Sequence, residues 1–125
     1  MYRAIILTLF ATFSTQLAAH DMTPTYPKWE PSHVQGVFKA QMELFNKRSD
    51  VRWYEIGVFT KDWKPVNFVS QYKIVRMDHL AKIKFDVYIN AIDVPMAEYI
   101  CSETRLRENS DKKPMISSKI CSRFK

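Results

Sequence analysis

Apolar and polar residues alternate along much of this 125-residue chain, a pattern that indicates β-strands. The clearest case is Lys82–Ile89, where every second residue is apolar, so all the apolar side chains share one face of a strand. Such a face needs a second apolar layer, and the pattern therefore predicts a sheet packed on another element. The run Met96–Ser102 is the expected neighbour of this strand.

A longer alternation over His33–Arg48 also predicts a strand. A helix is the competing interpretation, because Ser32 and Gln35 form a capping-box pattern and several apolar residues can share a helical face. Three prolines predict an irregular leader over His20–Ser32. Further strands are expected from β-branched and aromatic residues between polar turns, over Val51–Phe59, Val66–Ser70, Lys73–Met77, Met96–Ser102 and Met115–Phe124.

The first 19 residues have the pattern of a secretory signal peptide. Arg3 precedes a short apolar run, and small residues follow up to Ala19. The run is shorter than the roughly 20 apolar residues that a membrane span needs. We expect cleavage after Ala19, which leaves residues 20–125 as one periplasmic or secreted domain with no transmembrane segment. An uncleaved anchor is the alternative.

The two cysteines, Cys101 and Cys121, are expected to form a disulfide, because an even number of cysteines in an oxidising compartment indicates pairing. This disulfide would close a loop of about 20 residues, which in the chain-entropy model stabilises the fold by about 3 kcal/mol. The net charge of +6 is concentrated in the residues after 103. A basic end favours acidic partners or anionic surfaces, although a solvated face explains it equally well.

The sequence lacks the motifs of the common enzyme classes. Two isolated glycines exclude a phosphate-binding loop, and neither a nucleophile elbow nor a zinc-binding pattern occurs. We therefore expect a protein without catalytic activity or cofactor. Aromatic residues beside basic ones, as in Arg52-Trp53-Tyr54, could stack on bases. Core packing and export favour the interpretation without a nucleic-acid partner.

His20 suggests an alternative function as a metal ligand. Cleavage after Ala19 would place an α-amine beside its imidazole, and two such nitrogens can chelate Cu(II). His33 or His79 could complete a copper site on a small β-sandwich. A surface histidine near a chain end is the simpler interpretation, because no second ligand has a recognisable spacing.

Several segments resemble known immunoglobulin-like proteins. Ala97-x-Tyr99-x-Cys101 is similar to the tyrosine-corner strand of immunoglobulin domains. The order of Met42–Phe59, Trp63-Lys64-Pro65-Val66 and Leu80–Ile89 resembles more closely the N-terminal immunoglobulin-like domain of periplasmic pilus-assembly chaperones. This resemblance implies a single immunoglobulin-like β-sandwich of about seven strands, with the disulfide joining the last two strands.

The last strand is the preferred site for a partner, because an edge strand leaves backbone groups to which another strand can add. The residues proposed for this edge are Ile116, Lys119, Ile120, Arg123 and Phe124. An ordinary edge protected by its basic residues is the competing interpretation. The expected function is a non-enzymatic, chaperone-like binding or assembly module that engages an extended segment of another exported protein. A secreted cationic effector is a third interpretation.

Overall fold

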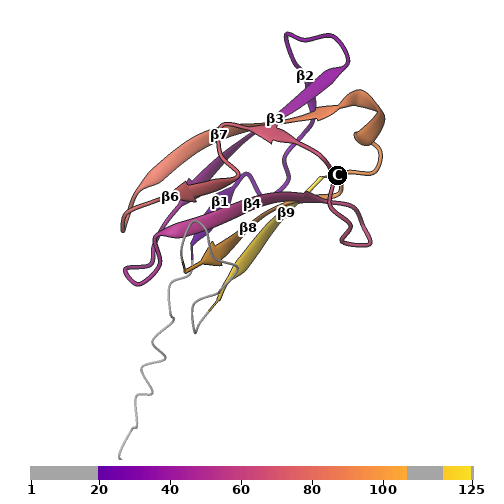
Figure 1. The fold of residues 1–125 in the computed structure, drawn as a ribbon. Coiled ribbons are helices and arrows are strands. Elements are labelled where there is room, and N and C mark those ends of the chain that lie inside the picture. The colour runs from indigo at the N-terminus through magenta and orange to yellow at the C-terminus, as the bar shows by residue number, and fades with distance from the viewer. Residues whose placement is uncertain (1–19, 107–116, 125) are drawn as a thin grey trace, which may run out of the picture.

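The computed structural model describes residues 20–106 and 117–124, which form two antiparallel sheets packed face to face (Figure 1). Sheet A contains β1 (Asp21–Thr23), β2 (Glu30–Pro31), β3 (Val37–Phe45), β7 (Lys82–Asn90) and β5 (Val69–Ser70). Sheet B contains, in spatial order, β6 (Ile74–Arg76), β4 (Trp53–Phe59), β8 (Tyr99–Arg105) and β9 (Lys119–Arg123). The predicted all-β, immunoglobulin-like sandwich is confirmed. The expected signal peptide lies outside the described residues and remains a prediction.

The strand interpretation of the longest alternating segments is confirmed. β3 and β7 pair along their whole lengths, from Val37 opposite Asn90 to Phe45 opposite Lys82. β3 starts later than expected, because a turn precedes it in which Gly36 adopts φ +78° and the Val37 amide donates to the Val34 carbonyl. The two strands bury alternate side chains, as a sheet with one solvated face should.

The predicted neighbour of the central strand is wrong. β8, which contains most of Met96–Ser102, lies in sheet B between β4 and β9, whereas β7 lies in sheet A between β3 and β5. The 3-10 helix η1 (Ala91–Asp93) and the residues after it carry the chain from one sheet to the other. Alternation along a strand identifies its buried face, but it does not identify the strand beside it.

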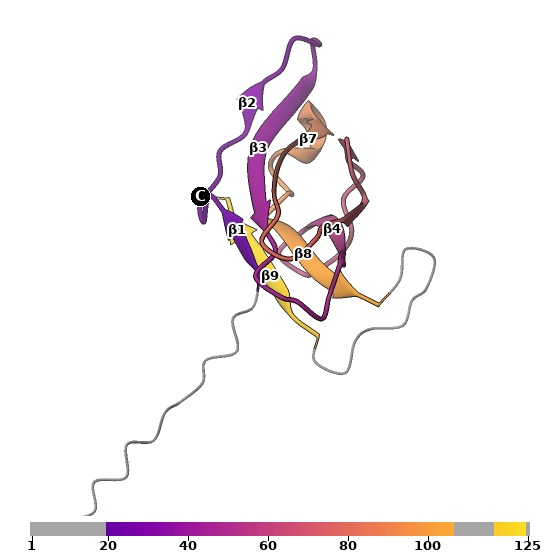
Figure 2. The same cartoon turned by 90° about the vertical axis from the view of Figure 1, so that its left-hand side faces the viewer.

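The leader is less irregular than the prolines suggested. β1 and β2 both pair with β3, which raises the number of strands to nine among the described residues. The prolines limit these pairings, because Pro24 follows β1 directly and Pro31 ends β2. The end-on view shows β1 running beside both β3 and β9 (Figure 2).

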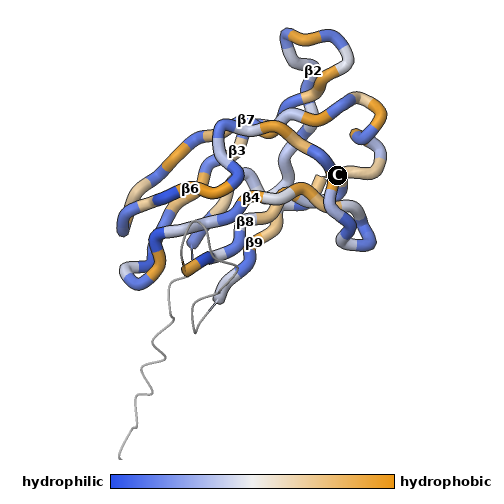
Figure 3. The backbone as a smooth tube through the Cα atoms, viewed as in Figure 1, coloured by the Kyte–Doolittle hydropathy of each residue, from blue (hydrophilic) through white to orange (hydrophobic). Residues whose placement is uncertain are grey.

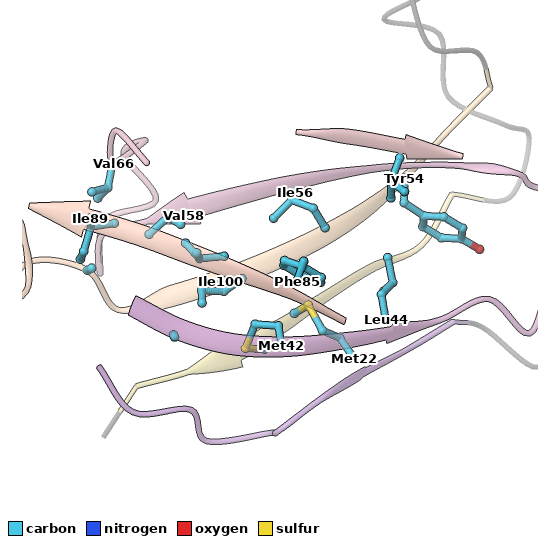
Figure 4. Packing of buried hydrophobic residues seen from close by; sticks show 14 of the residues in the cluster. Met22, Met42, Leu44, Tyr54, Ile56, Val58, Val66, Phe85, Ile89 and Ile100 are labelled. Atoms are coloured by element: carbon cyan, nitrogen blue, oxygen red, sulfur yellow. The ribbon is translucent and has the colours of Figure 1, made fainter. Parts of the chain in front are cut away.

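The core lies between the two sheets, and hydropathy alternates along the strands that enclose it (Figure 3). Met42, Leu44 and Phe85 of sheet A pack against the apolar side chains of sheet B (Figure 4). Five buried residues form the opposing layer: Tyr54, Ile56, Val58, Val75 and Ile100. None of the helices in the described part of the chain is long and apolar enough to cross a membrane.

Candidate partner-binding edge

β9 is an outer strand of sheet B, so one side of its backbone is not used by the sheet. The Phe124 amide donates to the Glu98 carbonyl at 2.8 Å, and the Thr104 amide donates to the Ser118 carbonyl at 3.0 Å. Hydrogen-bonded pairs alternate along an antiparallel ladder, so even-numbered residues of this segment bond to β8. The backbone groups of Lys119, Cys121 and Arg123 consequently point outward, away from β8.

Two of these three outward positions make no backbone hydrogen bond in the described part of the chain, although β1 lies beside β9. The Arg123 amide donates to the Thr25 carbonyl at 3.1 Å. For Lys119 and Cys121, the described residues provide no backbone hydrogen bond on the outward side. Two consecutive outward positions can accept a short added strand through main-chain hydrogen bonds.

The predicted disulfide is confirmed and fixes this edge. Cys101 and Cys121 lie directly opposite each other in β8 and β9, with 4.1 Å between their Cα atoms. Such a close approach is characteristic of a pair whose backbones do not hydrogen-bond to each other. The disulfide therefore holds β9 on β8 while the outward backbone groups of Cys121 stay open.

The side chains predicted for the edge divide between the two faces of sheet B. Ile120 packs against the core, and the ring of Phe124 stacks on Trp29 with 4.3 Å between the ring centroids. Lys119 and Arg123 are exposed on the outer face. The structure therefore gives these two apolar residues partners within the fold, and Arg123 Nε donates to Glu98 Oε1 at 2.9 Å. Ile116 lies outside the described residues.

An aromatic cluster beside the edge was not predicted. The rings of Trp63 and Tyr99 stack with 4.3 Å between their centroids, and Phe59 lies 6.2 Å from Trp63. The Lys119 ammonium lies 4.7 Å from the ring centroid of Phe59 and 5.1 Å from that of Trp63. These cation–π contacts hold the Lys119 side chain across the outer face of sheet B, away from the open edge.

Gly57 was the one sequence signal that could have revealed this cluster. The Phe59 ring leans back over Gly57, where a Cβ would lie 2.7 Å from the ring. A glycine inside a strand often marks such a close approach. Trp63 could not have been placed in the same way, because its φ of +64° is rare for a bulky residue.

His20 lies fully buried beside the edge rather than on the surface. Its Nδ1 is 3.0 Å from Ser118 Oγ, and its Nε2 is 2.8 Å from Ser102 Oγ. Its ring also contacts Tyr54, with 4.7 Å between centroids. Burial lowers the pKa of His20, since the charged form would lose its hydration; the Ser102 carbonyl opposes this shift, and the nearby Arg48 guanidinium adds to it.

The copper alternative receives no support from this arrangement. Both ring nitrogens of His20 already contact serine oxygens, so a copper ion would have to replace those contacts. His33 precedes β3, at the end of the sandwich opposite His20, and His79 is exposed between β6 and β7. Among the described residues, no group of three potential ligands is placed to hold a metal ion.

The polar residues next to His20 form one connected network. The Asn46 amide donates to the Val51 and Met77 carbonyls at 2.9 and 3.0 Å, and Asn46 Oδ1 accepts from the Tyr54 hydroxyl. Burial raises the pKa of Tyr54 to about 12. Arg48 binds both oxygens of Asp50, which lowers the pKa of that carboxyl group. This network joins the end of β3 to β4 and to the residue after β6.

Comparison with known proteins identifies the fold. No family model and no curated protein sequence matches the chain. The chaperone DraB of E. coli superimposes with a TM-score of 0.61 at 12% identity, over 85% of this chain and 53% of that one. The complex of the Salmonella enterica SafA pilin with the SafB chaperone gives a TM-score of 0.61 at 12% identity, over 89% and 55%. This chain thus spans about half the length of the chains it matches, and it has the immunoglobulin-like fold of periplasmic pilus-assembly chaperones, as its sequence resemblance predicted.

Proposed function

We propose that the protein is an exported, non-enzymatic binding or assembly module that engages an extended segment of another exported protein through β9. The outward backbone groups of Lys119 and Cys121 carry this proposal, because they offer the hydrogen bonds that an added strand requires. The fold shared with pilus-assembly chaperones supports it, since one of those chaperones was captured with a pilin. Export follows from the signal peptide expected over residues 1–19.

The disulfide explains how β9 could bind an added strand and remain paired with β8. An outer strand held only by backbone hydrogen bonds can exchange with an incoming strand. Cys101–Cys121 joins β9 covalently to β8, so an added segment extends sheet B instead of displacing its last strand.

Two substitutions at one position test the proposal. Lys119→Pro removes an outward amide that does not bond to β8, and proline is tolerated where an edge amide faces solvent. Lys119→Ala is the matched control, because it removes the same side chain but keeps the amide. Tagged wild-type, K119A and K119P proteins should be used as baits for the exported fraction.

A specific strand partner should bind wild type and K119A and should be lost from K119P. In the complex, the amides of Lys119 and Cys121 should gain protection from hydrogen exchange. The proposal fails if the captured partner binds K119P as well as K119A, because the outward amide then has no role. Circular dichroism of the three baits controls for unfolding of K119P.

A further inference from the structure

The segment His20–Thr25, which we call the cover segment, runs along the open side of β9. Its first residue contacts Ser118, just before β9, and its last residue accepts the hydrogen bond of the Arg123 amide. Between these two points β1 pairs with β3, and Met22 enters the core at 5% exposure. The cover segment therefore spans from sheet A to the edge of sheet B.

Few interactions hold this segment in place. Among the residues that the structure describes, β1 has three residues and pairs with β3 alone, and Pro24 ends its pairing. The register places the Asp21 and Thr23 backbones in hydrogen-bonded pairs with Phe45 and Glu43. Short strands with few buried contacts open locally at lower free energy than the rest of a fold. Met22 and His20 supply the buried side chains of this segment.

His20 is held in a site that suits its neutral ring. Its side chain is fully buried, and each ring nitrogen contacts one serine hydroxyl, which can donate or accept a hydrogen bond. Tyr54 covers the ring and is itself bonded to Asn46. A charged imidazolium in this place would lose its hydration without gaining a carboxylate partner of its own.

The surrounding charges also oppose protonation. From the β3–β4 turn, Arg48 raises the local positive potential, although it is paired with Asp50. From β1, Asp21 favours the charged ring, but its carboxylate is already paired with Lys47. The remaining contacts are the ring of Tyr54, the hydroxyl groups of Ser102 and Ser118, and the Ser102 carbonyl, which lies 3.3 Å from Nε2 and favours the charged ring, but burial outweighs it. Cleavage after Ala19 would add an α-ammonium group, which acts in the same direction as Arg48.

We propose that His20 is a pH-responsive latch: in a mildly acidic medium its protonation releases the cover segment and frees the outward backbone of Arg123. Release frees the outward amide of Arg123 and removes β1 from beside Lys119 and Cys121, so that all three outward positions become accessible. The proposal describes regulation of the site in the proposed function and rests on that function for its biological meaning. The opening itself can be measured without any partner.

The test is an NMR titration of the wild-type protein between pH 7.5 and pH 4.5. The His20 ring protons report protonation, while exchange of the Arg123 and Thr23 amides, corrected for the intrinsic rate, reports opening. Protection of both amides should fall by up to about tenfold for each pH unit below about 6.5. The fall should stop at the pH where the buried ring of His20 itself becomes protonated. The midpoint of the His20 ring should lie below the ordinary value for a histidine.

Two variants make the measurement specific. His20→Gln keeps a side chain that can donate and accept hydrogen bonds but cannot become charged, so the protection of Arg123 should become independent of pH over this range. His79→Gln is the matched control and should retain the wild-type profile. Equal pH profiles for wild type and H20Q would overturn the latch. So would complete protonation of His20 in wild type without loss of protection at Arg123, a result that does not depend on H20Q folding.

The two proposals can fail separately. Opening of the cover segment without any strand partner at β9 would leave the latch intact and remove the proposed function. A partner that binds wild type and K119A equally at pH 7.5 and pH 5, with no change in Arg123 protection, would support the module and overturn the latch.

Discussion

The two ends of the sandwich are stabilised by different kinds of interaction. At one end, polar side chains are buried and bonded to one another and to backbone carbonyls; these are His20, Asn46, Arg48, Tyr54, Ser102 and Thr104. At the other end, aromatic rings stack, with Trp29 on Phe124 and Trp63 on Tyr99. Five of the six buried polar or charged residues in the described chain belong to the first end.

This difference indicates where single atoms matter. Hydrogen bonds in a buried network depend on direction, and removing one partner leaves another group without hydration. Stacked rings gain mainly from the area they cover, so the loss of one polar atom should have little effect there. The open edge of β9 runs between these two ends, from Ser118 to Phe124.

The largest effect is expected from Asn46→Ala, which should destabilise the fold by about 4 kcal/mol. It leaves the Val51 and Met77 carbonyls and the Tyr54 hydroxyl without their buried partner, at about 1–3 kcal/mol for each group. Urea denaturation gives the free energy of unfolding. Asn67→Ala, at an exposed position, is the control and should be close to neutral. A loss for N46A no greater than for N67A would contradict the role given to this network.

The next largest loss of stability is expected when the disulfide is removed. This bond belongs to neither end of the sandwich. Replacing both Cys101 and Cys121 by Ser should lower the free energy of unfolding by about 3 kcal/mol, because the unfolded chain gains the freedom of a loop with a sequence separation of 20. Reductant should destabilise the wild type by a similar amount and leave the double variant unchanged. An unchanged melting temperature in the double variant would show that the bond contributes nothing to stability.

Ionisation of Tyr54 at alkaline pH should destabilise the polar end of the sandwich and leave the aromatic end unaffected. Its pKa is raised from 10.0 to about 12 on folding, so its contribution is fully present below pH 10 and is lost as the pH rises toward 12. The free energy of unfolding should fall by about 2–3 kcal/mol, because each unit of pKa shift corresponds to about 1.36 kcal/mol. Because this loss exceeds the roughly 1.5 kcal/mol that the hydroxyl contributes at neutral pH, the stability curves of wild type and Tyr54→Phe should approach each other and then cross at high pH. Parallel curves would mean that Tyr54 ionises as freely in the folded protein as in the unfolded chain.

The smallest effect is expected from Trp29→Phe at the aromatic end. Trp29 Nε1 is buried and has no hydrogen-bond partner among the described residues, so removing this desolvated donor should offset the area that the smaller ring no longer covers on Phe124, for a net change of less than about 0.5 kcal/mol. Tyr54→Phe is the matched substitution at the polar end and should cost about 1.5 kcal/mol at neutral pH. Similar losses for the two variants, measured by urea denaturation, would remove the contrast between the ends.

The sequence predicted much of the local structure but less of the long-range arrangement. Alternation correctly predicted the buried face of β7 and the strand β3, because a strand's side chains alternate whatever lies beside it. The neighbour of β7 was wrong, since the choice between two sheets depends on how η1 and the following residues turn. Such non-local choices leave no periodic signal in the chain.

The candidate site was predictable in outline only. The cysteine pair could be paired without the structure because the chain contains only two cysteines. The burial of His20 could not be predicted, because it depends on Ser102 and Ser118, which lie 82 and 98 residues further along the chain. A polar residue next to a chain segment rich in prolines indicates a surface position, and only the packing of β1 against two sheets places it inside.

The position of the disulfide also determines how the protein would respond to tension. If the chain is pulled from residues 20 and 124, the segment between Cys101 and Cys121 cannot extend while the bond is intact. At about 3.5 Å per extended residue, this removes roughly 70 Å from the length that unfolding would otherwise release. A partner that pulls on the end of β9 would transmit its load through the two sulfur atoms into β8, and only then into the hydrogen bonds of sheet B.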